Sequence, residues 1–183
     1  MFSIIIATHD SERALVPTLA ALVPGATAGI VREVIVADGG STDETEQVTE
    51  VAGCDFCRSS EPLGVRLRAA AATARANWLM FLWPGVALAP GWIEDVVAFM
   101  EETDRRDRPR AAAFDTGGRS IMAAVRRQFR AFPQPQQGLV LAKTFYEDVG
   151  GHRDDANPEG SLLRRIGRRR LTTLRTEAFL VDI

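Results

Sequence analysis

The stretch Ile35–Glu46 reads IVADGGSTDETE, the pattern of a buried strand that ends in a glycine-rich turn before a helix. An apolar run stops at Asp38, passes two glycines and meets a polar segment in which Ser41 and Glu44 have the spacing of a capping box at a helix start. A glycine-rich turn between a strand and a helix is typical of an anion site, because backbone N–H groups and the helix dipole face the ligand. The acidic residues in this turn argue against a phosphate and favour a ligand that donates hydrogen bonds.

The alternation of a short apolar run and a helical pattern recurs along the chain. Nearly all-apolar runs predict strands that are buried on both faces of a sheet. The predicted strands are Phe2–Ala7, Glu33–Ala37, Cys54–Arg58, Trp78–Leu82 and Leu139–Ala142, and the predicted helices follow Ser11 up to Gly25, begin at Ser41, cover Val65–Ala76, run from Pro90 to about Asp104, cover Arg119–Phe132 and end at Gly150. This order predicts an α/β fold, one domain with a mostly parallel central sheet flanked by helices. The buried runs Ile4–Ile6, Val34–Val36 and Leu79–Leu82 are expected to be adjacent strands of this sheet.

Charge is distributed unevenly over the 183 residues, although the net charge is only −2. Residues 1–104 contain 6 arginines and 15 acidic residues, whereas residues 105–183 contain 16 basic and 9 acidic residues, so the two halves carry −9 and +7. We expect the halves to contact different partners, the basic half phosphates or an anionic surface. Nucleic acid is not an expected partner, because the chain is acidic overall and shows no motif of a nucleic-acid reader.

Neither a targeting segment nor a membrane span is predicted. The start, MFSIIIATHD, lacks a basic leader, and the longest apolar stretch, Trp78–Ile93, is interrupted by two prolines and two glycines. We therefore expect a cytoplasmic protein. Cys54 and Cys57 form a lone C-x-x-C; in a strand their side chains would face opposite ways, which favours two reduced cysteines over a zinc site and leaves their role open.

Polar residues follow three of the predicted strands, where ligands of open parallel sheets bind. They are Thr8, His9 and Asp10; Asp38, Gly39 and Gly40; and Trp83, Pro84 and Gly85. Two neighbouring carboxylates, Asp10 and Asp38, would repel a phosphate between them but suit ribose hydroxyls or the N–H groups of a base. The alternative is that Asp38 caps a turn and Ser41 caps a helix.

Two motifs carry a resemblance to a known family. SIIIATHDSE (Ser3–Glu12) followed by EVIVADGGSTDET (Glu33–Thr45) resembles the family-two glycosyltransferases of the nucleotide-sugar-binding GT-A fold. Those enzymes typically open with a strand ending P-T-x-N-E, and a second strand reads V-I-V-V-D-G-G-S-T-D-x-T. Asp10 stands where asparagine is usual. QQGLVLAKTFYEDVGGHR (Gln136–Arg153) is similar to the acceptor-side segment of the family, and the resemblance extends from Ser3 to about Thr173.

The resemblance implies an inverting sugar transfer from a nucleotide sugar, a UDP-sugar by default, to an acceptor that the sequence does not name. It implies a nucleotide-binding half, 1–104, and an acceptor-side half, 105–183. The residues that it assigns to nucleotide binding are Thr8, His9, Asp10, Asp38, Gly39 and Gly40.

The family's metal motif is missing. Family members carry an Asp-x-Asp type motif after the strand that matches Trp78–Leu82, and its carboxylates hold the Mg²⁺ or Mn²⁺ that neutralises the leaving diphosphate. Here the strand continues into Trp83–Gly85, which offer no side-chain oxygen, so no metal ligands are expected. Arg66 and Arg68 could bind the diphosphate instead, although residues two apart do not share a helical face and a solvated face is the alternative.

The catalytic base and the basic segments depart from the family pattern or leave alternatives open. The family takes its base from a Glu-Asp pair before an arginine-rich helix; here Glu159 holds the first position and Gly160 the second. Glu159 is the expected catalytic residue, and Asp154 and Asp155 are alternatives. The cluster RRIGRRR (164–170), with Arg126, Arg127 and Arg130, predicts a solvated surface or one that docks on anionic lipid at the inner face of the membrane or on a phosphorylated acceptor.

The sequence also leaves open the role of two tryptophans and the choice between a sugar transferase and two other kinds of protein. Trp83 and Trp92 are expected to pack in the core or the cleft wall, with sugar stacking as the alternative. The loss of both motifs favours slow or absent turnover, so a catalytically silent nucleotide- or partner-binding relative with the same fold is the main alternative to an enzyme. A nucleotidyltransferase is disfavoured, because the first loop lacks a glycine-rich, basic phosphate loop.

Overall fold

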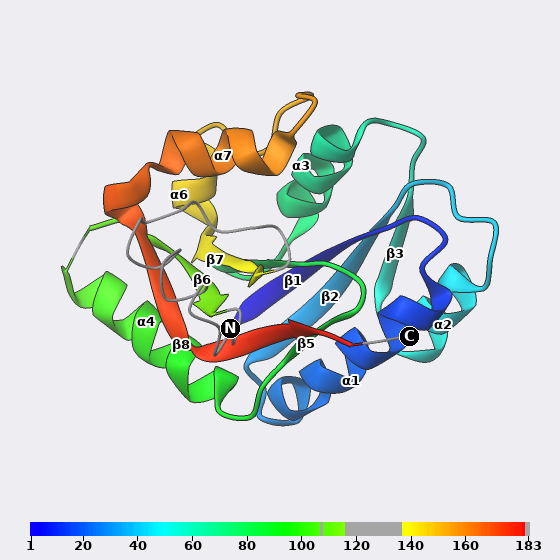
Figure 1. Cartoon of the computed structure of the whole chain (residues 1–183), viewed down its shortest axis with the longest axis horizontal. Helices are drawn as coiled ribbons and strands as arrows, with labels where there is room; N and C mark the ends of the chain where they lie inside the picture. Colours follow the sequence, from blue (N-terminus) through cyan, green and yellow to red (C-terminus); the bar gives the residue numbers. More distant parts are fainter. Residues whose placement is uncertain (107, 116–136, 182–183) are drawn as a thin grey trace, which may run out of the picture.

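The structure is a computed structural model that describes residues 1–106, 108–115 and 137–181. One eight-stranded sheet runs through the molecule, and helices lie on both sides of it (Figure 1). The strands are β1 (Phe2–Thr8), β2 (Val31–Asp38), β3 (Asp55–Arg58), β4 (Trp78–Leu82), β5 (Val86–Leu88), β6 (Ala111–Asp115), β7 (Leu139–Ala142) and β8 (Leu171–Leu180). The helices are α1 (Glu12–Thr27), α2 (Thr45–Val51), α3 (Leu63–Thr73), α4 (Trp92–Arg106), α6 (Lys143–Asp148) and α7 (Pro158–Ile166), with a 3₁₀ turn, η2 (Arg168–Arg170).

The strand order is β3-β2-β1-β4-β7-β6-β8-β5. β1 pairs in parallel with both β2 and β4, so the three buried runs predicted to be neighbours are neighbours. β7 runs antiparallel to β4 and β6. The predicted mostly parallel sheet is confirmed, and strands from both charge-asymmetric halves of the chain belong to it.

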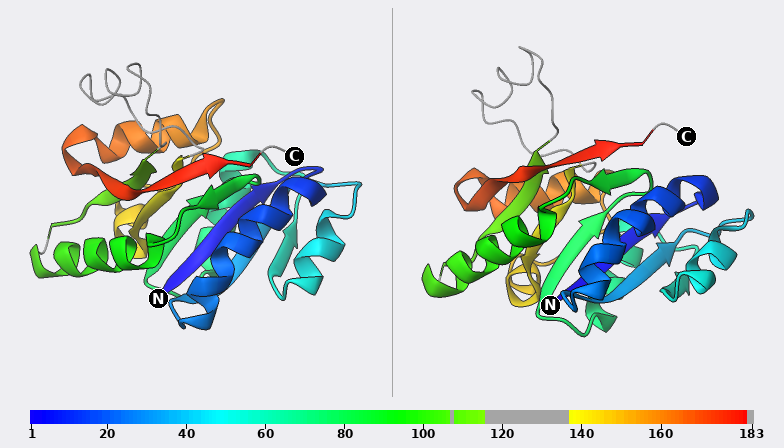
Figure 2. Two further views of the ribbon diagram at one scale, coloured as in Figure 1. Left: turned by 60° about the horizontal axis from the view of Figure 1, so that its bottom comes forward. Right: turned by 90° about the horizontal axis from the view of Figure 1, so that it is seen from below.

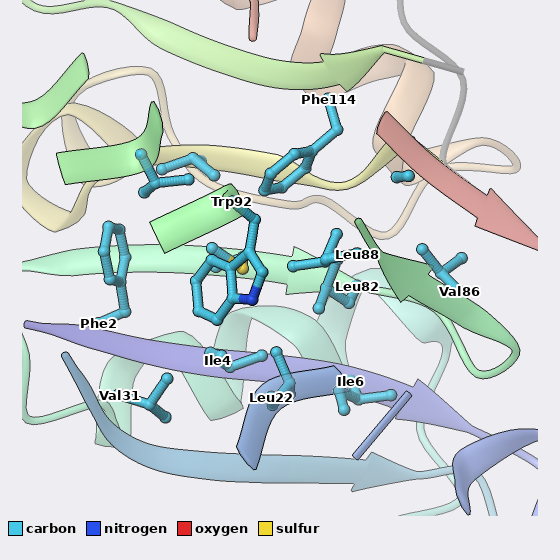
Figure 3. Close-up of a cluster of buried hydrophobic side chains, with 14 of the residues drawn as sticks. Phe2, Ile4, Ile6, Leu22, Val31, Leu82, Val86, Leu88, Trp92 and Phe114 are labelled. Carbon is cyan, nitrogen blue, oxygen red and sulfur yellow. The ribbon is translucent and has the colours of Figure 1, made fainter. Parts of the chain in front are cut away.

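The apolar pattern of β1 follows from burial on both faces. Phe2, Ile4 and Ile6 pack with α1 and α4 on one face, whereas Ile5 and Ala7 pack with α3, α6 and α7 on the other. Successive side chains of a strand point to opposite faces, so a strand covered on both sides reads as continuously apolar. Figure 3 shows the first cluster, in which the indole ring of Trp92 lies over β1 and β4.

Two local predictions are wrong, and a third lies beyond the described part of the chain. Gly25 does not end the first helix but lies within α1, where a Cβ would come within 2.6 Å of the Trp92 ring, so the helix can approach α4 closely. The capping box does not form, because α2 begins only at Thr45 and the Ser41 hydroxyl is bonded to Asp38 instead. The helix predicted over Arg119–Phe132 lies outside the described residues.

β8 was not predicted, because half of its side chains are exposed and it follows an arginine-rich turn. It pairs with β6 over its first part and with β5 at its end. Figure 2 shows that β8 carries the chain back toward α1, and the amide of Val181 donates to the carbonyl of Gly85 at 2.9 Å. In the described part of the chain, no helix combines the length and the hydropathy needed to cross a membrane.

Candidate functional site

The carboxyl ends of β1 and β2 lie side by side, as the sequence predicts. Thr8 is the register partner of Asp38, and its hydroxyl donates to Oδ1 of Asp38 at 2.9 Å. The amide of Gly39 donates to the carbonyl of Thr8 at 2.9 Å. The hydroxyl of Ser41 then joins the loops, since it accepts the Asp10 amide at 2.8 Å and donates to Asp38. Asp10 and Asp38 are thus brought together at one edge of the sheet.

The side chain of Asp38 is fully buried and its oxygens are occupied by the chain itself. Oδ1 accepts the hydroxyls of Thr8 and Ser41, and Oδ2 accepts the amides of Gly40 and Ser41, each at 2.8 Å. Burial alone would raise the pKa of Asp38, but these hydrogen bonds outweigh burial and leave its pKa lowered. This is the geometry of the turn-cap alternative, and a direct contact between Asp38 and a nucleoside stays a prediction.

The other acidic residues of these loops cap the neighbouring helix starts. Asp10 accepts the amide of Thr42 at 2.7 Å. Asp43 accepts the amide of Glu12 at 3.0 Å, and the Glu12 carboxylate in turn accepts the amide of Glu44 at 3.1 Å. Backbone amides that could otherwise bind an anion therefore donate their hydrogen bonds to carboxylates of the chain itself. This explains why the glycine-rich turn before α2 is so acidic.

The exposed part of this edge is lined by charged side chains. His9 is exposed, and its Nε2 lies 3.8 Å from Oδ2 of Asp10. Asp10 has a φ of +46°, in the left-handed region. Arg58, at the end of β3, was missed by the sequence analysis; its guanidinium reaches Glu46 at 2.8 Å and lies 3.7 Å from Asp38. Its position after a short, weakly apolar strand gave little signal.

Arg66 and Arg68 do not form a pair. Arg66 lies across the strand ends, where Nη1 donates to the carbonyls of Ala37 (2.6 Å) and Thr8 (3.3 Å), and its Nη2 would lie 3.0 Å from a Cβ at Gly39. Burial lowers the pKa of Arg66, an effect opposed by the charge of Asp38. Arg68 is exposed, and its charge acts instead on Tyr146 of α6. The two side chains serve different faces of α3, as their spacing indicates.

Two residues 76 positions apart meet beyond the end of β4. The indole Nε1 of Trp83 donates to Oε1 of Glu159 at 2.6 Å. Trp83 follows β4 directly, at the place of the family's metal motif, and Glu159 lies in the first turn of α7, at the place of the expected base. Burial raises the pKa of Glu159 to about 7, although the hydrogen bond from Trp83 acts in the opposite direction. This pairing was not predicted; the need of a buried indole N–H for an acceptor is the signal that could have suggested it.

The start of α7 explains how Glu159 is held. Asn157 caps the helix by accepting the Gly160 amide at 2.8 Å, and Pro158 occupies the first turn. A Cβ on Gly160 would lie 2.8–3.0 Å from the Asn157 side chain. The cap therefore leaves little room for a side chain at Gly160, where the family's Asp is expected. The loop before α7 packs tightly on α3, since a Cβ at Gly64 would overlap the carbonyl oxygen of Arg153. Asp154 and Asp155, the alternative bases, are exposed in this loop.

The residues after β4 do not fit the metal that the family implies. Trp83, Pro84 and Gly85 supply no side-chain oxygen, and the nearby carboxylate of Glu159 accepts the indole N–H. The described residues contain no group of three or more His, Cys, Asp or Glu side chains placed to hold a metal ion. Mg²⁺ and Mn²⁺ prefer several oxygen ligands, which these positions lack.

Several remaining candidates have structural roles. Trp92 is buried in the core, the first of the roles expected for it from the sequence. Arg165 donates to the carbonyls of Val149 and Gly151, and Arg170 donates to Ile166 at 2.7 Å, so part of the arginine cluster closes the ends of α6 and α7. Arg126, Arg127 and Arg130 lie outside the described residues.

Cys54 and Cys57 are free thiols, and burial is the first cause that raises the pKa of both.

The chain is similar to solved structures of TarS and of glucosyl-3-phosphoglycerate synthase. It matches S. aureus TarS (1–349) with a TM-score of 0.75 at 16% identity, over 98% of this chain and 60% of that chain. It also matches the same TarS segment in complex with UDP-GlcNAc, with a TM-score of 0.73 at 17% identity, over 100% of this chain and 59% of that chain. It also matches glucosyl-3-phosphoglycerate synthase from Mycobacterium tuberculosis in complex with Mn²⁺, UDP and glucosyl-3-phosphoglycerate, with a TM-score of 0.73 at 17% identity, over 100% of this chain and 72% of that chain. The chain thus spans about 60% of the length of the TarS segment.

No curated protein sequence matches this chain. The sequence pattern of the family described as "Glycosyl transferase family 2" matches residues 3–138, most of the chain. That range contains the strand ends of β1, β2 and β4, and the solved structures share the fold over nearly the whole chain. The chain belongs to glycosyl transferase family 2 and has the GT-A fold.

Proposed function

We propose that this chain transfers a sugar from a nucleotide sugar, a UDP-sugar by default, to an acceptor hydroxyl with inversion at the anomeric carbon. Membership of the family supports sugar transfer, and the TarS and synthase structures with bound UDP support uridine as the base. The observation that carries the proposal is Glu159, a carboxyl group in the first turn of α7 that accepts the indole N–H of Trp83 beyond the end of β4 and whose pKa is raised to about 7. A general base is most effective when its pKa lies near the operating pH.

The nucleoside would lie over the ends of β1 and β2. The floor of this site is formed by residues that bond to one another, namely Thr8, Asp38, Gly39 and Gly40. Their main contribution is therefore to hold the two loops in one conformation. His9 and Asp10 are exposed above the floor and supply the direct contacts. In this proposal residues 1–104 form the nucleotide half and residues 105–183 the acceptor half.

Glu159 takes the proton of the acceptor hydroxyl while that oxygen attacks the anomeric carbon. The new glycosidic C–O bond forms as the bond from the anomeric carbon to the nucleoside diphosphate breaks, and the diphosphate leaves with the electron pair of that bond. The ionised form of Glu159 is the active one, so the rate should rise with pH through about 7.

Charge on the diphosphate would be met by arginine. Arg66 lies at the edge that the nucleoside approaches, and its Nη1 and Nε are bound to backbone carbonyls, which leaves Nη2 beside Gly39 to face a ligand. Arg58 adds a second guanidinium at the same edge. Because part of each guanidinium is already engaged, we expect only partial compensation for the family's metal and a slow reaction.

A catalytically silent nucleotide-binding relative is the second candidate. It is favoured by the lack of side-chain oxygens at Trp83–Gly85, where the family holds its metal. Such a protein would bind nucleotides at the same floor without breaking the sugar–phosphate bond.

Titration calorimetry of UDP and UDP-sugars, paired with a donor-hydrolysis assay, tests the proposal. We expect binding that depends weakly on Mn²⁺ and strongly on ionic strength, since exposed charge pairs are screened within about 10 Å at 0.1 M salt. Binding with slow hydrolysis supports the enzyme, and binding without any hydrolysis or transfer supports the silent relative. Tight binding that requires Mn²⁺, with turnover of about 1 s⁻¹ or faster, would contradict the account of the missing metal site.

A further inference from the structure

Trp83 is fixed by contacts on several sides. Its carbonyl accepts the amide of Val86 at 3.1 Å and the hydroxyl of Thr18 of α1 at 3.4 Å. The turn that follows is held as well, because the amide of Gly85 donates to the carbonyl of Ala14 at 2.7 Å and its carbonyl accepts Val181. The indole is therefore presented from a rigid turn, which suits a group that must hold another side chain in place.

Glu159 depends on this indole for its polar contact. Within the described residues, Trp83 is the one hydrogen-bond donor to its carboxyl group, and no ion pair involves Glu159. The charged and titratable groups on the elements packed against α7 are Arg66 and Arg68 of α3, Lys143, Tyr146, Glu147 and Asp148 of α6, His152, Arg153, Asp154 and Asp155 of the preceding loop, Arg164 and Arg165 of α7 and Arg168–Arg170 of η2. The hydrogen bond occupies Oε1 and leaves Oε2 without a donor in this part of the chain.

We propose that Trp83 is a positioning residue that holds Glu159 by Oε1 and so directs Oε2 toward the hydroxyl whose proton it takes. The position that carries a metal ligand in related enzymes would thus have changed its task, from holding a cation to orienting the base. The proposal rests on the proposed function for its catalytic meaning, but the contact itself can be tested without turnover.

The indole N–H favours the ionised carboxylate, so its loss has a predictable sign. Trp83→Phe keeps an aromatic ring in the same place and removes the donor. Burial of Glu159 would then act unopposed, and the pKa of Glu159 would rise further above 7. We expect an upward shift of about one unit, a tenfold change in proton affinity.

Carbon-13 NMR of the Glu159 carboxyl, titrated with pH, measures this shift in protein labelled at glutamate. Comparison with Glu159→Gln assigns the signal, and Trp92→Phe, a second indole change in the core, serves as the control that should leave the titration unchanged. Thermal unfolding of each variant verifies that it is folded. A Glu159 titration that is the same in wild type and folded Trp83→Phe would overturn the proposal. If Trp83→Phe does not fold, the measurement is repeated with Trp83→His, which retains a ring N–H, and Trp83→Ala, which has none. The pKa of Glu159 should be lower in Trp83→His than in Trp83→Ala, and equal values would overturn the proposal.

The pH profile of transfer or donor hydrolysis then separates the two claims. If Trp83 positions the base, the rise in rate with pH should move up with the NMR titration in Trp83→Phe, and the maximal rate should fall about tenfold or more, within the usual contribution of a general base. A shifted titration in a protein without any turnover would overturn the proposed function while confirming the contact. A shifted titration with an unchanged rate profile would overturn the positioning role.

Discussion

The carboxylate of Glu159 and the indole N–H of Trp83 lie 2.6 Å apart, which joins the first turn of α7 to the end of β4. Trp83 stands where the sequence analysis expects a metal ligand of the family, and Glu159, the expected base, directly precedes Gly160. The expected metal position and the expected base are therefore in direct contact. A half-buried carboxyl group with its pKa raised to about 7 is a frequent feature of active sites.

Glu159→Gln should alter how stability depends on pH. The pKa of Glu159 is raised from 4.5 to about 7 in the folded protein, so the native state binds a proton that the unfolded state releases between these values. Stability from this group is complete below pH 4.5 and is lost as pH rises through about 7. Urea unfolding at pH 5 and pH 8 should show a smaller loss in Glu159→Gln than in wild type, while Glu147→Gln, at an exposed position, should behave like wild type. An identical loss in all three proteins would contradict the raised pKa.

Asp38→Asn should destabilise the fold and reduce its sensitivity to acid. The amide would place a donor against the hydroxyls or amides that now donate to Asp38, at a cost of about 2–3 kcal/mol. The pKa of Asp38 is lowered in the folded state, so its contribution is present above its ordinary value of 3.8 and is lost as pH falls through the folded pKa. Urea unfolding at pH 7 and pH 3 measures both effects, with exposed Asp148→Asn as the control. An Asp38→Asn protein as stable as wild type at pH 7 would exclude the cap role.

Asp10→Asn should tighten binding of a nucleoside diphosphate. Asn tolerates the left-handed φ of +46°, and its side-chain oxygen can still accept the Thr42 amide. The change removes a negative charge from the exposed edge, worth about a two- to fivefold gain in UDP affinity at low salt. Calorimetry should show little change for uridine, because the amide oxygen of the new side chain can still accept the hydrogen bonds that Asp10 offers the nucleoside, and a gain for UDP that shrinks at high salt. Equal changes for both ligands would mean that the charge of Asp10 does not act on the diphosphate.

Gly64→Ala should loosen the contact between α3 and the loop before α7. The added Cβ would overlap the carbonyl oxygen of Arg153 and crowd Pro158, and backbone cannot move as easily as a side-chain end. We expect a loss of about 1–3 kcal/mol, the usual cost of overpacking. Thermal unfolding checks this result against Ala69→Ser, a change on the exposed side of the same helix. Equal melting temperatures would show that this close approach is not needed for stability.

The sequence predicted the central strands because their pattern depends on burial alone. β1, β2 and β4 are covered on both faces, so their apolar runs could be recognised and their adjacency inferred. β8 could not be found in this way, since only two of its ten residues are buried and its place depends on pairing with β5 and β6. Long-range pairing leaves little trace in the local sequence.

The candidate site was predicted at the level of positions but not of roles. Ligands of open parallel sheets bind at the carboxyl ends of the strands, and this rule placed Thr8, Asp10 and Asp38 at one edge. It could not show that both carboxylate oxygens of Asp38 already accept hydrogen bonds from neighbouring residues. The family pattern drew attention to Trp83 and Glu159 separately. Their contact depends on how α7 packs beyond β4, which only the three-dimensional structure reveals.

Metal-independent transfer with Glu159 as the base is tested by the rate of transfer or hydrolysis of a UDP-sugar as a function of pH, measured in the presence of a metal chelator for wild type and Glu159→Gln. We expect a slow rate that persists with chelator, rises through about pH 7 and is lost in Glu159→Gln. A rate that disappears with chelator and returns with Mn²⁺, or one that is equal in the two proteins, would rule out this mechanism.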